Sequence, residues 1–410
     1  MNGHRPKLDC VRDKKTKKIE DRTQSSKRLE ELKNADSIPQ ELKMEILLRL
    51  PAKTLVRVVS ASKLFVPIIR RRDLINSFLS QSLTRPRFLF TLSNRNSMLF
   101  FSSSPYDNAQ PSLDRRKCLV PDSFYMASRS VGGLILSNAA AQLLICNPTT
   151  GQVRTLPKIR SRRKGVTSFF GYDPIDHQYK VLCMTQLRIY HRHENKHVAT
   201  GEHQVLTLGA QEKWRMIECS VPHCPATDGV CINGVVYYGA CTGKDMNELV
   251  LVSFDVRSEE FGFIRLPGDV EKSRLFHLTL INYQGKVAVA DGGPFVGYDL
   301  WILEDAKKHE WSKIHVWHKY FDDKNLFVIG TTTSHEIIFA PMHFRRPFYV
   351  TYYNGKGNSI RRVKIEGIDD HGYRNRYLGL SSDFCRHVGL SSDFCRIWTF
   401  SDHAENIMPL

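Results

Sequence analysis

Several features that would assign a chain to a familiar class are missing from this sequence of 410 residues. It has no run of about 18 apolar residues, the length that spans a membrane, and its nearest approach, residues 131–146, is broken by Ser137, Asn138 and Gln142. The N-terminus is polar and has no apolar signal core. The ten cysteines include no Cys-x-x-Cys pair, which suits reduced thiols. We therefore expect a soluble protein of the nucleus or cytoplasm, without a membrane partner.

Acidic residues are scarcer than basic ones, but the imbalance is not where a nucleic-acid reader would carry it. The formal net charge is +17, of which residues 1–34 carry +5 and residues 35–87 carry +6, leaving +6 for the other 323 residues. A protein that binds nucleic acid concentrates its positive charge in the binding domain. The distribution of charge argues against a nucleic-acid partner.

Catalytic motifs are missing as well: there is no glycine-rich phosphate loop, no Gly-x-Ser-x-Gly elbow and no Ser-x-x-Lys pair. Zinc requires three or four converging ligands. Two groups contain suitable residue types, namely His191, His193 and His197 with Glu194, and Cys219, His223 and Cys224 near Cys231. We interpret the first group as a solvated loop of mixed charge and the second as isolated side chains around a buried thiol. No metal, cofactor or catalytic residue is expected.

An amphipathic helical stretch lies between Ser37 and Arg72. Ser37 and Gln40 have the spacing of a capping box, and Pro39 is predicted in the first turn, where a missing N–H costs little. Pro51 is predicted to end this first helix.

The apolar surface of this first helix is wider than its own core requires. Leu42, Ile46 and Leu50 form one ridge, and their apolar neighbours extend it over roughly two-thirds of the helical wheel, against the arc of about 100° that faces a core. Further helices are predicted over residues 53–62, 63–70 and 73–82. Short helices in so few residues bury too little apolar surface to be stable alone. The pattern therefore indicates a helical module with an apolar face that docks on a partner.

From Phe88 onward the pattern is that of short β-strands separated by turns. The aromatic residues Trp214, Phe261 and Trp311 open the second strands of three strand pairs and lie 47 and 50 residues apart. A hairpin turn at Asn233-Gly234 recurs 51 residues later at Gln284-Gly285. Two hairpins per period make a four-stranded blade, so we predict a β-propeller, with six blades favoured over seven. A pair of β-sandwiches with coincidental spacing is the alternative.

The helical stretch resembles the F-box. The matching residues are Ile38-Pro39, Glu41-Leu42, Glu45-Ile46, Arg49 to Leu55, Ser62-Lys63 and Ile68-Ile69, with Glu41, Phe65 and Pro67 as departures from the usual pattern. The resemblance implies docking to the small adaptor of an SCF-type cullin–RING ubiquitin ligase, and to the cullin through it. The adaptor-binding residues it implies are Pro39, Leu42, Glu45, Ile46, Leu50 and Pro51. The alternative is an ordinary helix pair that caps the next domain.

The β-rich part resembles the F-box-associated domain of a large plant family, of the type 3 and kelch-like kind. The matching stretches include Cys146 to Gly151, Gly171 to Pro174, Ile232 to Tyr238, and Asp402 to Asn406 near the C-terminus. The expected fold is thus an α+β multidomain chain, with a disordered basic tail over 1–34, an F-box module of three helices over 35–82 and an all-β, propeller-like domain over 83–410. The implied function is that of a non-catalytic substrate receptor. The alternative is an interaction scaffold without a ligase role.

Two basic loops are candidates for contact with a target protein, because arginine-rich loops suit acidic or phosphorylated peptides. Their residues are Arg162 and Arg163 in the first, and Phe344, Arg345 and Arg346 in the second. Solvated loop tips are the alternative for each.

Two further sequence features, a run of basic residues and a repeated octapeptide, are not part of these loops. Residues 14–18 form either a nuclear localisation signal or a solvated charge run. An octapeptide at 379–386 recurs at 389–396, and we expect only the second copy to pair in the final strand.

Overall fold

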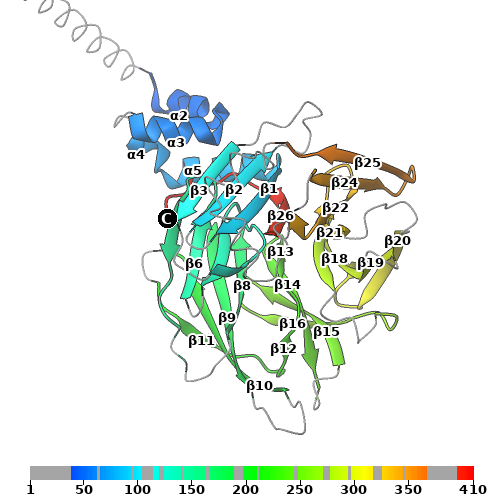
Figure 1. The fold of residues 1–410 in the computed structure, drawn as a ribbon. Coiled ribbons are helices and arrows are strands. Elements are labelled where there is room, and N and C mark those ends of the chain that lie inside the picture. The colour runs from blue at the N-terminus through cyan, green and yellow to red at the C-terminus, as the bar shows by residue number, and fades with distance from the viewer. Residues whose placement is uncertain are drawn as a thin grey trace, which may run out of the picture. The chain divides into compact units, whose positions relative to one another are not determined.

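The computed structural model describes residues 38–61, 65–94, 97–103, 114–119, 124–139, 142–159, 161, 166–188, 197–209, 212–243, 248–270, 278–293, 297–316, 326–344, 347–366 and 395–410. The chain divides into two compact units, with the boundary between Leu74 and Ile75. The first unit contains short helices, and the second contains the strands (Figure 1). Among the described residues, no helix is long and apolar enough to cross a membrane.

Among the residues that the structure describes, four helices precede the strands: α2 (Gln40–Arg49), α3 (Ala52–Ala61), α4 (Val66–Ile69) and α5 (Arg72–Leu83). The prediction that Pro51 ends the first helix is confirmed, because α2 stops at Arg49 with Leu50 in an extended conformation. Pro67 lies in the first turn of α4, where it delays the start of the helix and does not kink it.

The predicted capping box at the start of the first helix is wrong. Pro39 is the N-cap residue of α2, its ψ of 147° is extended, and its own side chain makes no capping hydrogen bond. The first helical bond runs from the Lys43 N–H to the Pro39 carbonyl over 3.1 Å. Ser37, the predicted cap, lies outside the described residues. The helix therefore begins after Pro39, whose φ is fixed by its ring.

The strands form six antiparallel sheets. The first joins β1 (Arg87–Asn94), β2 (Ser97–Ser103) and β3 (Asp114–Leu119) to β26 (Cys395–His403) and β23 (His343–Phe344). The second contains β4 (Phe124–Ala127), β5 (Ile135–Ala139), β6 (Gln142–Asn147) and β7 (Gln152–Thr155). The third contains β8 (Val166–Asp173), β9 (Gln178–Arg188), β10 (His197–Thr207) and β11 (Arg215–Ile217).

The fourth sheet contains β12 (Cys224–Pro225), β13 (Val230–Ile232), β14 (Val235–Thr242), β15 (Glu248–Asp255) and β16 (Phe261–Arg265). The fifth contains β17 (Thr279–Tyr283), β18 (Lys286–Gly293), β19 (Gly297–Asp305) and β20 (Glu310–Val316). The sixth contains β21 (Leu326–Thr331), β22 (Ile337–Pro341), β24 (Tyr349–Asn354) and β25 (Ser359–Lys364). We call these sheets blades 1 to 6.

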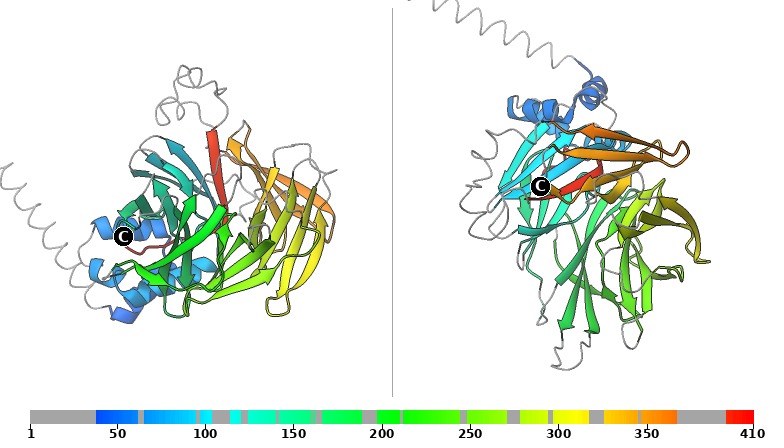
Figure 2. Two further views of the ribbon diagram at one scale, coloured as in Figure 1. Left: turned by 90° about the horizontal axis from the view of Figure 1, so that it is seen from below. Right: turned by 45° about the vertical axis from the view of Figure 1, so that its right-hand side comes forward.

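The blades close into a ring because the last strand completes the first blade. Consecutive blades contact one another in chain order, and β21 of blade 6 contacts β26 of blade 1. β26 pairs antiparallel with β1, with Leu89 opposite Phe400 and Phe90 opposite Thr399. In both views of Figure 2, β26 (red) lies between the blue-to-cyan strands of blade 1 and the orange strands of blade 6. The predicted six-bladed propeller is confirmed, and the paired sandwiches are excluded.

The repeat period seen in the sequence has a structural cause. The two predicted hairpin turns have left-handed backbones, with φ of 50° and 85° at Asn233-Gly234 and of 56° and 80° at Gln284-Gly285, as a two-residue hairpin requires. Trp214 and Trp311 each reach back to the preceding blade. Their indole N–H groups donate to the carbonyls of Pro157 (2.8 Å) and Arg265 (2.9 Å). The periodic aromatics therefore join neighbouring blades.

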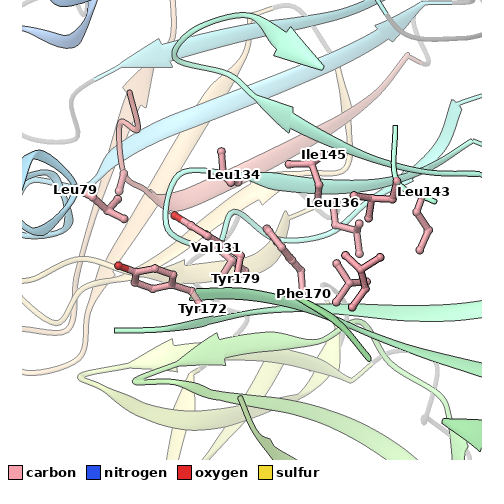
Figure 3. Close-up of a cluster of buried hydrophobic side chains, with 13 residues drawn as sticks. Leu79, Val131, Leu134, Leu136, Leu143, Ile145, Phe170, Tyr172 and Tyr179 are labelled. Carbon is pink, nitrogen blue, oxygen red and sulfur yellow. The ribbon is translucent and has the colours of Figure 1, made fainter. Parts of the chain in front are cut away.

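A buried cluster joins blades 2 and 3 to α5 and to the C-terminal segment. Figure 3 shows its labelled side chains, which come from α5, from β5 and β6 with the turn before them, and from β8 and β9. Leu79 of α5 and Ala404 after β26 are both members. Packing of this kind supplies most of the stability of a helix as short as α5.

The C-terminal segment is held by hydrogen bonds to a turn in blade 2. The Asn147 amide donates to the carbonyls of Asn406 and Met408, each over 3.0 Å. The Asn406 amide donates to the Gly132 carbonyl (2.7 Å) and to the Tyr179 hydroxyl (2.8 Å). The two motifs that resembled the F-box-associated domain, around Asn147 and Asn406, therefore bind each other.

Gly133 and Ser82 complete the attachment of the C-terminal segment. Gly133 has a φ of +79°, and a Cβ there would lie 2.5 Å from the Ala404 carbonyl oxygen, so only glycine permits the approach. The Ser82 hydroxyl of α5 accepts a hydrogen bond from the Glu405 N–H over 2.6 Å. The segment therefore contacts both blade 2 and the helix that leads into the propeller.

Only part of the repeated octapeptide lies in the described residues. Its second copy ends in Cys395-Arg396, which begin β26 and pair with β23. The first copy, residues 379–386, lies outside the described residues.

Asn406→Ala should destabilise the propeller. The substitution removes both amide donations and the side-chain oxygen that accepts from the Met408 N–H, and it leaves the Tyr179 hydroxyl and the Gly132 carbonyl bonded to each other alone. We expect the free energy of unfolding to fall by about 2–3 kcal/mol, measured by urea denaturation. Ser77→Ala on the exposed face of α5 is the control and should change it by less than about 0.5 kcal/mol. Equal effects of the two substitutions would contradict the role given to Asn406.

Candidate functional site

The helical unit presents an apolar surface on α2. Leu42 and Ile46 are 50% and 52% exposed, and Ile38 just before the helix is 37% exposed. Leu42 and Ile46 are four residues apart, so they lie on one face of the helix. Leu47, in contrast, is buried. Large aliphatic side chains that gather on one helix face and remain half exposed are a feature of protein-binding surfaces.

The other predicted adaptor-binding residues surround this pair. Pro39, Glu45 and Pro51 are exposed, whereas Leu50 is half-buried. Glu45 accepts a hydrogen bond from Arg49 over 2.6 Å in an exposed i,i+4 ion pair. Such a pair contributes only a few tenths of a kcal/mol to the helix, so it leaves both charges accessible to a partner.

The propeller contains a second candidate site in its centre, where two cavities of about 350 and 660 Å³ lie. Arg129, just before β5, lines both of them. Its guanidinium Nη1 donates to the Ile329 carbonyl of blade 6 over 2.9 Å. The adjacent Ser130 hydroxyl hydrogen-bonds the Nδ1 atom of His403 over 2.8 Å. The segment before β5 therefore braces blade 2 against blades 6 and 1.

Charged groups from separate blades face one another in this centre. Burial raises the pKa of the Asp402 carboxyl, and the positive charge of Arg129 opposes that shift. Burial likewise lowers the pKa of the Arg129 guanidinium, against the attraction of Asp402 and Asp228. Arg129 and Asp402 line the smaller cavity, and Arg129 and Asp228 line the larger one, so each cavity offers a donor and an acceptor to a polar ligand group.

Inner hairpin turns form the rim of the smaller cavity. Asn233 donates through its amide to the Gly285 carbonyl over 3.2 Å, and the Thr331 hydroxyl donates to the Asn282 carbonyl over 2.9 Å. All four residues line the cavity. These bonds connect blades 4, 5 and 6, so the rim is held by its own turns.

The predicted target-binding arginines are not among the residues whose structure is described. Arg162, Arg163, Arg345 and Arg346 lie outside the described residues, and of Phe344 only the backbone, at the end of β23, is described. The same holds for His191, His193 and Glu194, while His197 begins β10.

Sequence reasoning missed the central cluster of Arg129, Asp228 and Asp402. The three residues come from segments far apart in the chain, and only the closure of the ring brings them together. Asp402 belonged to a motif that had been noticed, but Arg129 and Asp228 carried no local signal.

By its fold, this chain is a β-propeller protein. Six blades follow a short helical unit at the N-terminal side. A model of the family described as the F-box associated beta propeller domain matches residues 87–404. The chain is 36% identical over 383 residues to F-box protein At4g11590 of Arabidopsis thaliana, covering 88% of this chain and 94% of that protein. It is also 36% identical over 366 residues to F-box protein DOR of Arabidopsis thaliana, covering 82% and 89% respectively. The chain therefore belongs to the plant F-box proteins with an F-box-associated β-propeller domain.

Arg129→Met should destabilise the propeller more at neutral than at acidic pH. The folded-state pKa of Asp402 is raised, so its contribution to stability falls as the pH rises above about 4, and loss of the opposing Arg129 charge deepens that fall. We expect a loss of about 3 kcal/mol at pH 7.5, and a clearly smaller loss at pH 4.5, by urea denaturation.

Arg257→Met is the matched control for this prediction. Arg257 forms an exposed ion pair with Asp176 over 3.4 Å, so its loss should change stability little at either pH. A loss for Arg129→Met that is the same at both pH values would contradict the coupling between Arg129 and Asp402.

Proposed function

We propose that this chain is the substrate-recognition subunit of an SCF-type cullin–RING ubiquitin ligase. Its helical unit binds the adaptor, which connects it to the cullin, and its propeller binds the protein to be ubiquitinated. The observation that carries the proposal is the half-exposed pair Leu42 and Ile46 on α2, in a chain that belongs to the F-box proteins.

Adaptor binding would cover an apolar surface that now contacts water. Full burial of a leucine or isoleucine contributes about 1.5–3 kcal/mol, and half of each side chain in this pair remains to be buried. The proposed contacts are Leu42 and Ile46 themselves and four residues near them in the sequence: Pro39, Glu45, Leu50 and Pro51. Glu45 would add a charge at the edge of the contact, where it affects orientation more than affinity.

The proposed role needs no catalytic residue on this chain. The transfer of ubiquitin would be performed by a conjugating enzyme that the ligase recruits. This chain would contribute proximity, since holding a target lysine near the activated ubiquitin converts a bimolecular encounter into a local one.

The target protein would bind to the propeller. Arg162, Arg163, Phe344, Arg345 and Arg346 remain the proposed contacts, because their composition combines arginines with an aromatic residue, as interface hot spots do. Such loops favour acidic or phosphorylated segments of a target.

The double substitution Leu42→Asp with Ile46→Asp should abolish co-purification of the adaptor. Each aspartate would be desolvated without a partner in the apolar contact, at a cost that exceeds the gain from the remaining contacts. We expect the recovered adaptor to fall at least about 100-fold, which corresponds to about 2.7 kcal/mol.

Ile175→Asp with Met216→Asp is the control for this experiment. These two side chains are 64% and 60% exposed on the propeller, so the change in charge and in exposed apolar surface is matched. The control variant should retain the adaptor. Undiminished recovery of adaptor by the Leu42 and Ile46 variant would refute docking through this face of α2.

Charge removal in the basic loops should reduce target capture without affecting the adaptor. With the proteasome blocked, we expect the quadruple alanine variant of Arg162, Arg163, Arg345 and Arg346 to lose proteins that the intact chain retains, as judged by affinity capture and mass spectrometry. The matched control replaces four other arginines that are exposed on the propeller, Arg215, Arg257, Arg265 and Arg362. An identical set of captured proteins would contradict these contacts. Captured proteins that are never turned over would indicate a scaffold in place of a ligase receptor.

A further inference from the structure

Three metal-ligating side chains converge at the junction of blades 3 and 4. His203 lies on β10 of blade 3, and Cys219 and His223 lie in the segment that leads from β11 to β12. One potential ligand atom from each residue lies within 4.8 Å of the other two. Both histidines are buried and Cys219 is half-buried, so the cluster is not a chance arrangement of exposed side chains.

The distances within the cluster match those between ligands of one small cation. Zinc binds sulfur at about 2.3 Å and nitrogen at about 2.0–2.1 Å, so two of its ligand atoms in a tetrahedron lie about 3.5 Å apart. The Cys219 Sγ and His223 Nδ1 atoms are 3.8 Å apart. The other two pairs of ligand atoms lie within 4.8 Å, so side-chain rotation has to bring them closer by up to about 1.3 Å.

The Val221 carbonyl oxygen faces both Cys219 and His223. It lies 3.0 Å from His223 Nδ1 and 3.4 Å from Cys219 Sγ. A proton on each of these two atoms can point at this one oxygen. A cation between the sulfur and the nitrogen would replace both protons and leave the carbonyl close enough to face it.

A second interaction orients His223 for coordination. Its Nε2 atom lies 2.7 Å from the Tyr238 hydroxyl. Tyr238 is fully buried, and its ring stacks on Phe169 with 4.2 Å between centroids, so the hydroxyl is fixed in place. Metal-bound histidines almost always donate their other ring N–H to such a partner.

We propose that His203, Cys219 and His223 bind one Zn²⁺ ion. Two imidazoles and a thiolate are a donor set that zinc prefers, whereas magnesium and calcium prefer oxygen. On binding, the Cys219 thiol releases one proton to solvent, and His223 changes tautomer, so that its single proton leaves Nδ1 and is carried on Nε2, which donates it to the Tyr238 hydroxyl. Water or the Val221 carbonyl completes the tetrahedron. The ion would fasten the segment between blades 3 and 4 to β10.

This site would revise the expectation that the chain binds no metal. Cys219 and His223 had been noticed in the sequence, but His203 lies 16 residues before Cys219, inside a strand. Pairing of β10 with β11, with His203 opposite Ile217, places that strand beside the following segment. The sequence pattern alone did not indicate this approach.

Metal content of the purified full-length chain tests the proposal. After equilibration with Zn²⁺ and removal of unbound metal, we expect one zinc per chain by elemental mass spectrometry. Cobalt substitution should add a thiolate-to-metal charge-transfer band, which Cys219→Ser removes. Tyr238→Phe keeps the packed ring but loses the outer hydrogen bond, and should weaken zinc affinity about 10–100-fold.

Matched variants separate this site from other thiols and imidazoles. Cys241→Ser and His309→Asn should keep one zinc per chain, and so should Cys224→Ser, the thiol adjacent to His223. Circular dichroism identifies variants that fail to fold. If the ligand variants do not fold, the zinc affinity of Tyr238→Phe is used as the test of the site. The proposal is overturned if the folded wild-type chain binds no zinc, or if folded His203→Asn and Cys219→Ser bind as much as wild type. Loss of zinc in Cys224→Ser alone would also overturn it.

Discussion

The hydrogen bonding of the C-terminal segment to blade 2 is the constraint on which the propeller depends. A ring of sheets is stable only if its first and last blades join, and here β26 joins them by pairing with β1 across more than 300 residues of sequence. Asn147 and Asn406 then hold the residues beyond β26 in place. The apolar contacts between blades stabilise the fold only once the ring has closed, because closure is what removes their surfaces from water together.

Closure of the ring also creates the chemistry at its centre. Arg129, Asp228 and Asp402 lie in three different parts of the chain, and each charge would be solvated in an open sheet. In the closed ring, burial lowers the pKa of Arg129 and raises that of Asp402, while their mutual attraction opposes both shifts. The rim turns, bonded to one another through Asn233 and Thr331, are fixed by the same closure. A surface fixed in this way has little ordering left to undergo if a partner binds to it.

Much of the fold could be predicted, because the relevant signals are local. Pro51 ended α2 as expected, and Asn-Gly at 233–234 produced the left-handed hairpin that its backbone requires. The aromatic period near 50 residues reflects the hydrogen bonds by which Trp214 and Trp311, at the outer strands of blades 3 and 5, contact the preceding blade. The start of α2 was mispredicted, since the capping-box pattern competes with the fixed geometry of Pro39 and the proline prevailed.

The candidate sites divide in the same way. The apolar surface of α2 was visible in the sequence, because residues on one helix face recur every three or four positions whatever the helix packs against. By itself, the sequence determined the strand pairs of three repeats, a period that favours six blades and the apolar helix face. Only the tertiary structure decided which residues meet across blades: Arg129 with Asp402, Asn147 with Asn406, and His203 with Cys219 and His223. The physical reason is that these contacts depend on the angle and distance between whole sheets, which cannot be read from the spacing of residues along the chain.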